Sequence, residues 1–119
     1  MAAPNPTDIL NRIIDIVPRQ TSEDILCGVS EECAELAQAA LKMRRVLTGT
    51  DPTPLTFDEA MANLTEEIAD LELMLITLKR KFEVTNDIIW PIEQRKLNRF
   101  ERRLDERDRK EAIYEPEES

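Results

Sequence analysis

Apolar residues recur every three or four positions along most of the chain, which is the spacing of one face of an α-helix. The first such stretch covers residues 6–17, with Asn5 as its N-cap and Pro6 in its first position, and Pro18 ends it. The second stretch begins after Thr21 or Ser22, covers residues 22–47 and stops at Gly49. The N-terminal part of the chain therefore predicts a short helix followed by a long one.

Two more helices are predicted after a loop that contains prolines. Residues 56–59 read Thr-Phe-Asp-Glu, the pattern of a capping box, and open a third helix that continues to residue 82. A fourth helix begins near Asp87 or at Pro91 and ends near Glu111, with a narrow apolar stripe of Leu97, Phe100 and Leu104. The pattern predicts an all-α protein of the four-helix-bundle type.

The third helix is predicted to be apolar on two sides, and this affects the expected assembly. One side carries Leu64, Leu71, Leu75 and Leu78, and the other carries Ala62, Ala69, Leu73 and Ile76. Because the short first helix covers only part of this surface, we expect a homodimer or homotetramer to complete the bundle. Residues 1–112 are expected to form one domain, and residues 113–119 a disordered acidic tail.

The absence of histidine restricts the possible chemistry more than any other feature of the amino-acid composition. The 119 residues contain no His, which excludes Ser-His-Asp and Cys-His catalysis and histidine-containing metal sites. Any bound metal must then be held by oxygen, which favours Mg²⁺, Mn²⁺ or Ca²⁺. Ca²⁺ sensing through an EF-hand is not expected, because no loop of that pattern is present.

Charge and hydropathy indicate a cytoplasmic protein that binds neither nucleic acid nor membrane. The net charge of −9 disfavours a polyanionic partner. No apolar run is long enough to span a bilayer, and the first residues do not resemble a signal peptide.

The acidic residues of the second and third predicted helices have few bases near them. No Lys or Arg occurs between residues 20 and 41 or between residues 46 and 78. Glu31 and Glu35 form a like-charge pair four residues apart, as do Glu66 and Asp70, and such pairs destabilise a helix. This arrangement suggests that something other than a side-chain base neutralises these carboxylates.

The helical positions of the carboxylates differ between the two helices. On the second helix, Glu31 and Glu35 lie opposite the arc expected to pack, which comprises Leu26, Val29, Cys33, Leu36 and Ala40. Solvent exposure alone therefore explains these two as well as a binding site does. On the third helix, Glu67 falls inside the apolar arc and Asp70 lies at its edge. A carboxylate inside an apolar arc is expensive unless it is paired or binds a metal, although a distant Arg is a simpler partner for it.

Glu31-Glu32-Cys33-Ala34-Glu35 fits the pattern E-E-x-x-E, and Glu67-Ile68-Ala69-Asp70 fits E-x-x-D. Two such half-motifs on consecutive helices resemble the all-α NTP pyrophosphatases, and the sequence around them looks most like the small MazG-like proteins. The resemblance covers about residues 22–82. It implies a Mg²⁺-dependent enzyme that converts a nucleoside triphosphate to the monophosphate and pyrophosphate, with Mn²⁺ as a second candidate metal.

The resemblance also implies roles for individual residues. It assigns catalysis to Glu31, Glu32, Glu35, Glu67 and Asp70, and among them it assigns the metal to Glu32, Glu35, Glu67 and Asp70. Basic residues should contact the phosphates, and the candidates are Lys42, Lys96 and Arg99. Each also has a simpler explanation, Lys42 as a favourable charge near a helix C-terminus and the other two as parts of a solvated face. Trp90, the only Trp, is a candidate for stacking on the base or a packing anchor.

A non-enzymatic alternative from another class fits the same composition. An acidic helical oligomer could act as an adaptor that binds a partner protein. It leaves unexplained the repeated like-charge pairs and the position of Glu67 in the apolar arc. Nucleotide hydrolysis measured with and without Mg²⁺ separates the enzyme from the adaptor.

Overall fold

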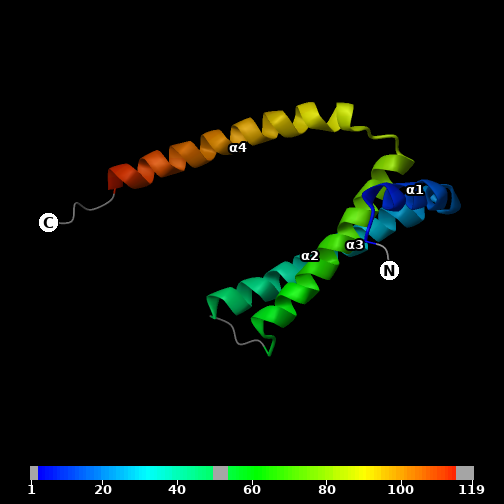
Figure 1. The fold of residues 1–119 in the computed structure, drawn as a ribbon. Helices are drawn as coiled ribbons and strands as arrows, with labels where there is room; N and C mark the ends of the chain where they lie inside the picture. The colour runs from blue at the N-terminus through cyan, green and yellow to red at the C-terminus, as the bar shows by residue number, and fades with distance from the viewer. Residues whose placement is uncertain (1–2, 50–53, 115–119) are drawn as a thin grey trace. The chain divides into compact units, whose positions relative to one another are not determined.

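The structure is a computed structural model in which residues 3–49 and 54–114 are described. Within those ranges the chain is all helical and has no strand. The elements are α1 (Pro6–Ile16), a 3₁₀ turn η1 (Val17–Arg19), α2 (Ser22–Thr48), α3 (Phe57–Lys81) and α4 (Asn86–Tyr114) (Figure 1). None of these helices combines the length and the apolar character needed to cross a membrane. The all-α prediction and the four expected helices are confirmed.

The chain divides into two compact units, Met1–Glu83 and Val84–Ser119. The first unit contains α1, η1, α2 and α3, and the second contains α4. A single domain over residues 1–112 stays a prediction. Of the predicted acidic tail, residues 115–119 lie outside the described residues, while residues 113 and 114 belong to α4.

The helices of the first unit begin and end at residues that supply the missing hydrogen bonds of a helix terminus. The Asn5 side chain accepts a hydrogen bond from the Thr7 amide at 2.9 Å, and Pro6 occupies the first turn. Thr56 and Glu59 form the predicted capping box, each side chain bonding the other residue's amide at 3.2 Å. Gly49 ends α2 with a φ of 62°, a conformation that glycine adopts without strain.

The first unit is built on the pairing of α2 with α3, which run in opposite directions. The start of α2 lies beside the end of α3, since Lys81 Nζ donates a hydrogen bond to the Gln20 carbonyl at 2.9 Å. About two turns into α2, the Met74 side chain of α3 packs against Gly28, since a Cβ there would lie 2.7 Å from Met74 Cε. Side chains buried in this unit include Ile25, Ala39, Met43 and Ala60.

The face of α2 that is buried differs from the predicted one. We expected an arc centred near Cys33, but Leu26 is 49% exposed and Cys33 is also exposed. The buried residues of α2 are instead Ile25, Ala39 and Met43. The apolar surface of α2 is broad, and α3 covers only the edge of it that lies nearest the acidic residues. The other edge is exposed within the unit Met1–Glu83.

The short helix α1 partly covers the second apolar side of α3. Ile13 and Val17 are buried, whereas Ile9 and Leu10 border an apolar groove of about 530 Å³ between α1 and α3. Across this groove lie Leu73 and Ile76 of α3, and Leu73 is 45% exposed. The prediction that α1 cannot cover this side fully is therefore confirmed.

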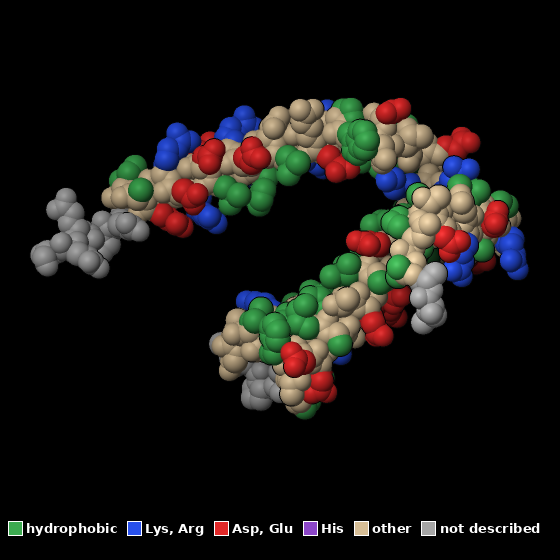
Figure 2. Space-filling view, in the orientation of Figure 1, with side chains coloured by type: hydrophobic (Ala, Val, Ile, Leu, Met, Phe, Trp, Pro, Cys, Tyr) green, Lys and Arg blue, Asp and Glu red, His purple; other side chains and the backbone are tan. Residues whose placement is uncertain are grey.

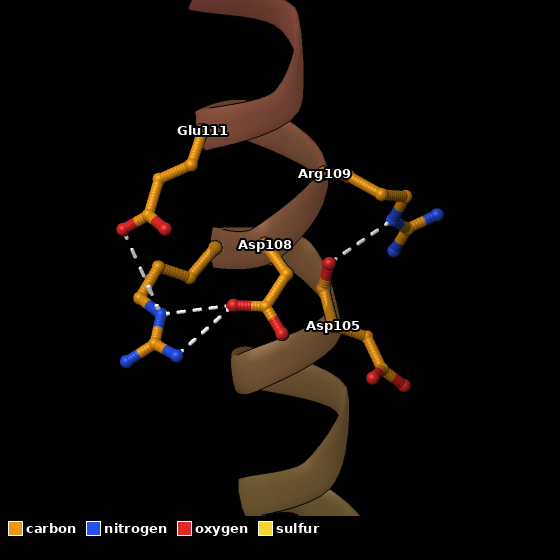
Figure 3. A network of polar contacts seen from close by, with 5 residues as sticks. Asp105, Asp108, Arg109 and Glu111 are labelled. Atoms are coloured by element: carbon orange, nitrogen blue, oxygen red, sulfur yellow. Dashed lines mark hydrogen bonds and ion pairs between the residues drawn. The ribbon is translucent and has the colours of Figure 1, made fainter. Parts of the chain in front are cut away.

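The second unit consists of α4, a helix of 29 residues rich in charged side chains. It begins at Asn86 and continues through Pro91, so of the two predicted starts the earlier one is nearer. Near its end, Arg107 donates hydrogen bonds to Asp108 and lies 3.9 Å from Glu111 (Figure 3). These pairs are exposed and each adds little stability.

Candidate metal site

Four carboxylates converge between α2 and α3. Glu32 and Glu35 come from α2, and Glu67 and Asp70 come from α3. In each pair the residues are three positions apart, so they lie on one face of their helix, one turn from each other. One carboxylate oxygen from each of the four residues lies within 4.8 Å of the others. We call these four residues the carboxylate cluster.

The carboxylate cluster has a buried half and an exposed half. Glu32 and Glu67 are half-buried between the helices, whereas Glu35 and Asp70 are exposed. Glu32 Oε2 and Glu67 Oε2 are shielded from solvent, and neither has a hydrogen-bond partner. No ion pair joins the four carboxylates to a Lys or Arg of the described residues. Such oxygens are destabilising unless a proton or a cation occupies the site.

The electrostatics of the cluster favour uptake of positive charge. Burial is the main factor that raises the pKa of Glu32, followed by the charges of Glu35 and Asp70. Burial also raises the pKa of Glu67, and the neighbouring Glu35 carboxylate adds to this effect. Both shifts have the same origin, since removing a carboxylate from water and placing it beside others disfavours its ionised form.

The residues fit a hard divalent cation. All four donors are carboxylate oxygens, the ligand type that Mg²⁺, Mn²⁺ and Ca²⁺ prefer. Two of the four residues present oxygens with no other partner, and a cation would satisfy both at once. The carboxylate cluster is therefore a group of acidic residues that could hold a metal ion.

The other predicted site residues are not members of the carboxylate cluster. Glu31 is exposed on α2 and is not one of the four cluster residues. Lys42 is half-buried on α2, about two turns beyond Glu35. Lys96, Arg99 and Trp90 belong to α4, in the second unit, and all three are exposed. The roles of these five residues in catalysis or substrate binding stay predictions.

Two features of the site were missed in the sequence. Glu32 lies on the buried face of α2, and its seven-residue spacing from both Ile25 and Ala39 was the available signal. Gly28 lies one turn before Glu32 and allows the helices to approach, although its sequence context does not distinguish it from any other glycine in a helix. By contrast, Glu67 is half-buried and Asp70 is exposed, which agrees with the prediction that Glu67 lies in the apolar arc and Asp70 at its edge.

Comparison of the chain with family models, with curated proteins and with solved structures found no match. The fold and the site therefore give a structural description of the protein, and no family is assigned to it. It is an all-α protein of four α-helices in its described residues, with a Glu/Asp cluster between two of them.

Proposed function

We propose that the protein is a nucleoside triphosphate pyrophosphohydrolase that depends on Mg²⁺, with Mn²⁺ as a second metal that could support it. It would convert a (deoxy)nucleoside triphosphate and water to the monophosphate and pyrophosphate. The observation that carries the proposal is the carboxylate cluster, with two shielded oxygens that have no partner. The resemblance of the two acidic half-motifs to the all-α NTP pyrophosphatases supplies the reaction class.

The cluster contains only acidic side chains, which explains why a nucleoside triphosphate would need a bound cation at this site. A triphosphate is an anion, and four carboxylates to which no Lys or Arg of the described residues is bonded would repel it. A divalent cation, when bound, supplies the positive charge that offsets this repulsion and polarises the phosphoryl group. Glu32 and Glu67 would hold it from the buried side, and Glu35 and Asp70 from the side open to substrate.

The arrangement also explains why both helices are needed. Neither α2 nor α3 alone provides more than two of the four carboxylates, so the cluster exists only when the helices are paired. The pairing is fixed by buried side chains such as Ile25 and Ala60, and by the close approach at Gly28. Ligands held on rigid, packed helices keep their geometry better than ligands on loops.

The direct test is hydrolysis of a panel of nucleoside triphosphates, with the products separated by chromatography. We expect a monophosphate and pyrophosphate, with activity that requires Mg²⁺ or Mn²⁺ and is lost in EDTA. A nucleoside diphosphate as the stable product, or full activity without metal, would contradict the proposal. Hydrolysis in isotopically labelled water then identifies the attacked phosphorus, since the label enters the product that carries it.

A protein-binding adaptor is the second candidate, and exposed apolar side chains favour it. Leu26, Leu41 and Leu47 are each about half exposed or more on α2. An oligomer interface accounts for the same surface, whereas an adaptor does not account for the unpartnered oxygens of Glu32 and Glu67. Cation binding without hydrolysis of any nucleotide in the panel would favour the adaptor.

A further inference from the structure

The helix α4 carries an apolar stripe that its own unit does not cover. Trp90, Leu97 and Leu104 are spaced by seven residues, and Phe100 lies between the last two on the same face. Trp90 is 60% exposed, Leu97 58% and Phe100 56%. Hydrophobic side chains gather along one edge of the middle of α4 in the view of Figure 2. We call these four residues the α4 stripe.

A helix with such a stripe needs a partner. The unit Val84–Ser119 has no other helix among its described residues, so nothing within it can bury the α4 stripe. Helices in proteins draw most of their stability from packing an apolar face against another element. The seven-residue spacing is that of a two-stranded coiled coil, in which the stripe of one helix packs on that of another.

The flanks of the α4 stripe carry opposite charges. On one side, at seven-residue intervals, lie Lys96, Arg103 and Lys110. On the other side lie Glu101 and Asp108, also seven residues apart. These are the positions that border the seam in a coiled coil and determine the orientation of its helices. Lys96, Glu101 and Arg103 form no ion pair within the described chain, so their charges are available to a partner.

We propose that α4 pairs in parallel with α4 of a second copy of this chain, through the α4 stripe. In a parallel pair the basic flank of each helix faces the acidic flank of the other, so Lys96 lies opposite Glu101 of the partner subunit. An antiparallel pair would place basic flank against basic flank. The seam positions on either side of Leu97–Leu104 are Glu93 and Arg107, and in a parallel pair each faces its own copy. The apolar contact is therefore centred on Leu97–Leu104, and Trp90 lies at its N-terminal end, beyond Glu93. The interface is separate from the carboxylate cluster, so the proposal does not depend on the proposed function.

Trp90 is the only Trp of the chain and reports on the N-terminal end of this interface. Sedimentation of the full chain is measured over a range of concentrations together with Trp90 emission and its quenching by acrylamide. We expect association, with Trp90 becoming shielded over the same concentration range. Phe100→Glu should abolish this association step and leave Trp90 exposed. Asn98→Glu is the matched control, because it adds the same charge on the opposite side of α4 and should change neither reading.

A charge exchange tests the orientation and does not require removal of an apolar residue. Lys96→Glu should raise the dissociation constant about tenfold, because two attractive pairs per dimer become repulsive. The double variant Lys96→Glu, Glu101→Lys should restore it. Tighter association of Lys96→Glu would overturn the parallel arrangement. A monomeric wild type with Trp90 shielded would overturn the proposal, since the stripe would then be covered within one chain, and so would association that leaves Trp90 exposed.

Discussion

Replacing Glu67 by Gln removes one charge from the carboxylate cluster and keeps the shape of the side chain. We expect Glu67→Gln to remain folded, to lose hydrolytic activity and to bind Mg²⁺ or Mn²⁺ poorly. Without metal the variant should be as stable as the wild type or more stable. The reason is that Glu67 Oε2 is shielded, lacks a hydrogen-bond partner and lies beside three other carboxylates. Removal of a poorly compensated charge of this kind relieves desolvation and repulsion.

The expected magnitude follows from the linkage between binding and folding. At a free cation concentration about 100 times the dissociation constant, a ligand that binds only the folded state stabilises it by about 2.7 kcal/mol. For a unit of the size of Met1–Glu83 this corresponds to a rise of roughly 10–20 °C in the unfolding midpoint. Loss of a direct ligand should weaken binding by at least the roughly 10–100-fold that loss of an outer-shell partner causes. At the same cation concentration, a tenfold loss of affinity would remove about half of the thermal shift in Glu67→Gln and a hundredfold loss would remove most of it.

The assay is a thermal unfolding scan with EDTA and with increasing Mg²⁺ or Mn²⁺, supported by calorimetric titration. Glu66→Gln is the matched control, because Glu66 precedes Glu67 on the same helix, is exposed and is not one of the four cluster residues. It removes the same charge and should retain the thermal shift. Equal shifts in wild type, Glu67→Gln and Glu66→Gln would show that the cation does not bind at the carboxylate cluster.

Two further predictions concern pH and assembly. Since the folded-state pKa values of Glu32 and Glu67 are raised, these groups stabilise the metal-free fold at low pH, and this contribution is lost as the pH rises through them. Urea unfolding in EDTA should therefore show a stability that falls toward neutral pH, less steeply in Glu67→Gln, and identical slopes would contradict this. Leu73→Glu or Ile76→Glu should disrupt assembly and activity together if the second apolar side of α3 contacts another subunit, because burial of each side chain contributes about 1.5–3 kcal/mol. Light scattering that finds an active wild-type monomer at micromolar concentration would refute the assembly prediction.

Most of the fold could be predicted because its signals are local. Asn5, Thr56 and Gly49 sit at helix ends and satisfy backbone groups within a few residues, so their roles are visible in the sequence alone. The packing face of α2 could not be predicted in the same way. Its apolar surface is wide, and which edge is covered depends on where α3 lies, which is a property of the paired helices.

The site likewise has features that the local sequence predicts and features that depend on how the helices pair. Glu67 could be identified because a charge within an otherwise apolar arc is unusual on a single helix. Glu32 was named through the E-E-x-x-E resemblance, but its burial could not be predicted, since that depends on the edge of α2 that α3 covers. The convergence of the four carboxylates also depends on the register between α2 and α3. That register involves contacts between residues far apart in the sequence, of which Gly28 with Met74 is one.

The close approach at Gly28 has a consequence for the choice between cations. Mg²⁺ binds oxygen at about 2.0–2.1 Å and Ca²⁺ at about 2.3–2.6 Å, so the two differ by a few tenths of an ångström. Alanine at position 28 would displace only the terminal methyl of Met74, the flexible end of a long side chain. A branched residue such as leucine would displace more of Met74 beside the turn that carries Glu32, and a change of a few tenths of an ångström between the helices of the cluster would alter which ion fits better. The choice of ion would then depend on packing at position 28, which lies outside the carboxylate cluster.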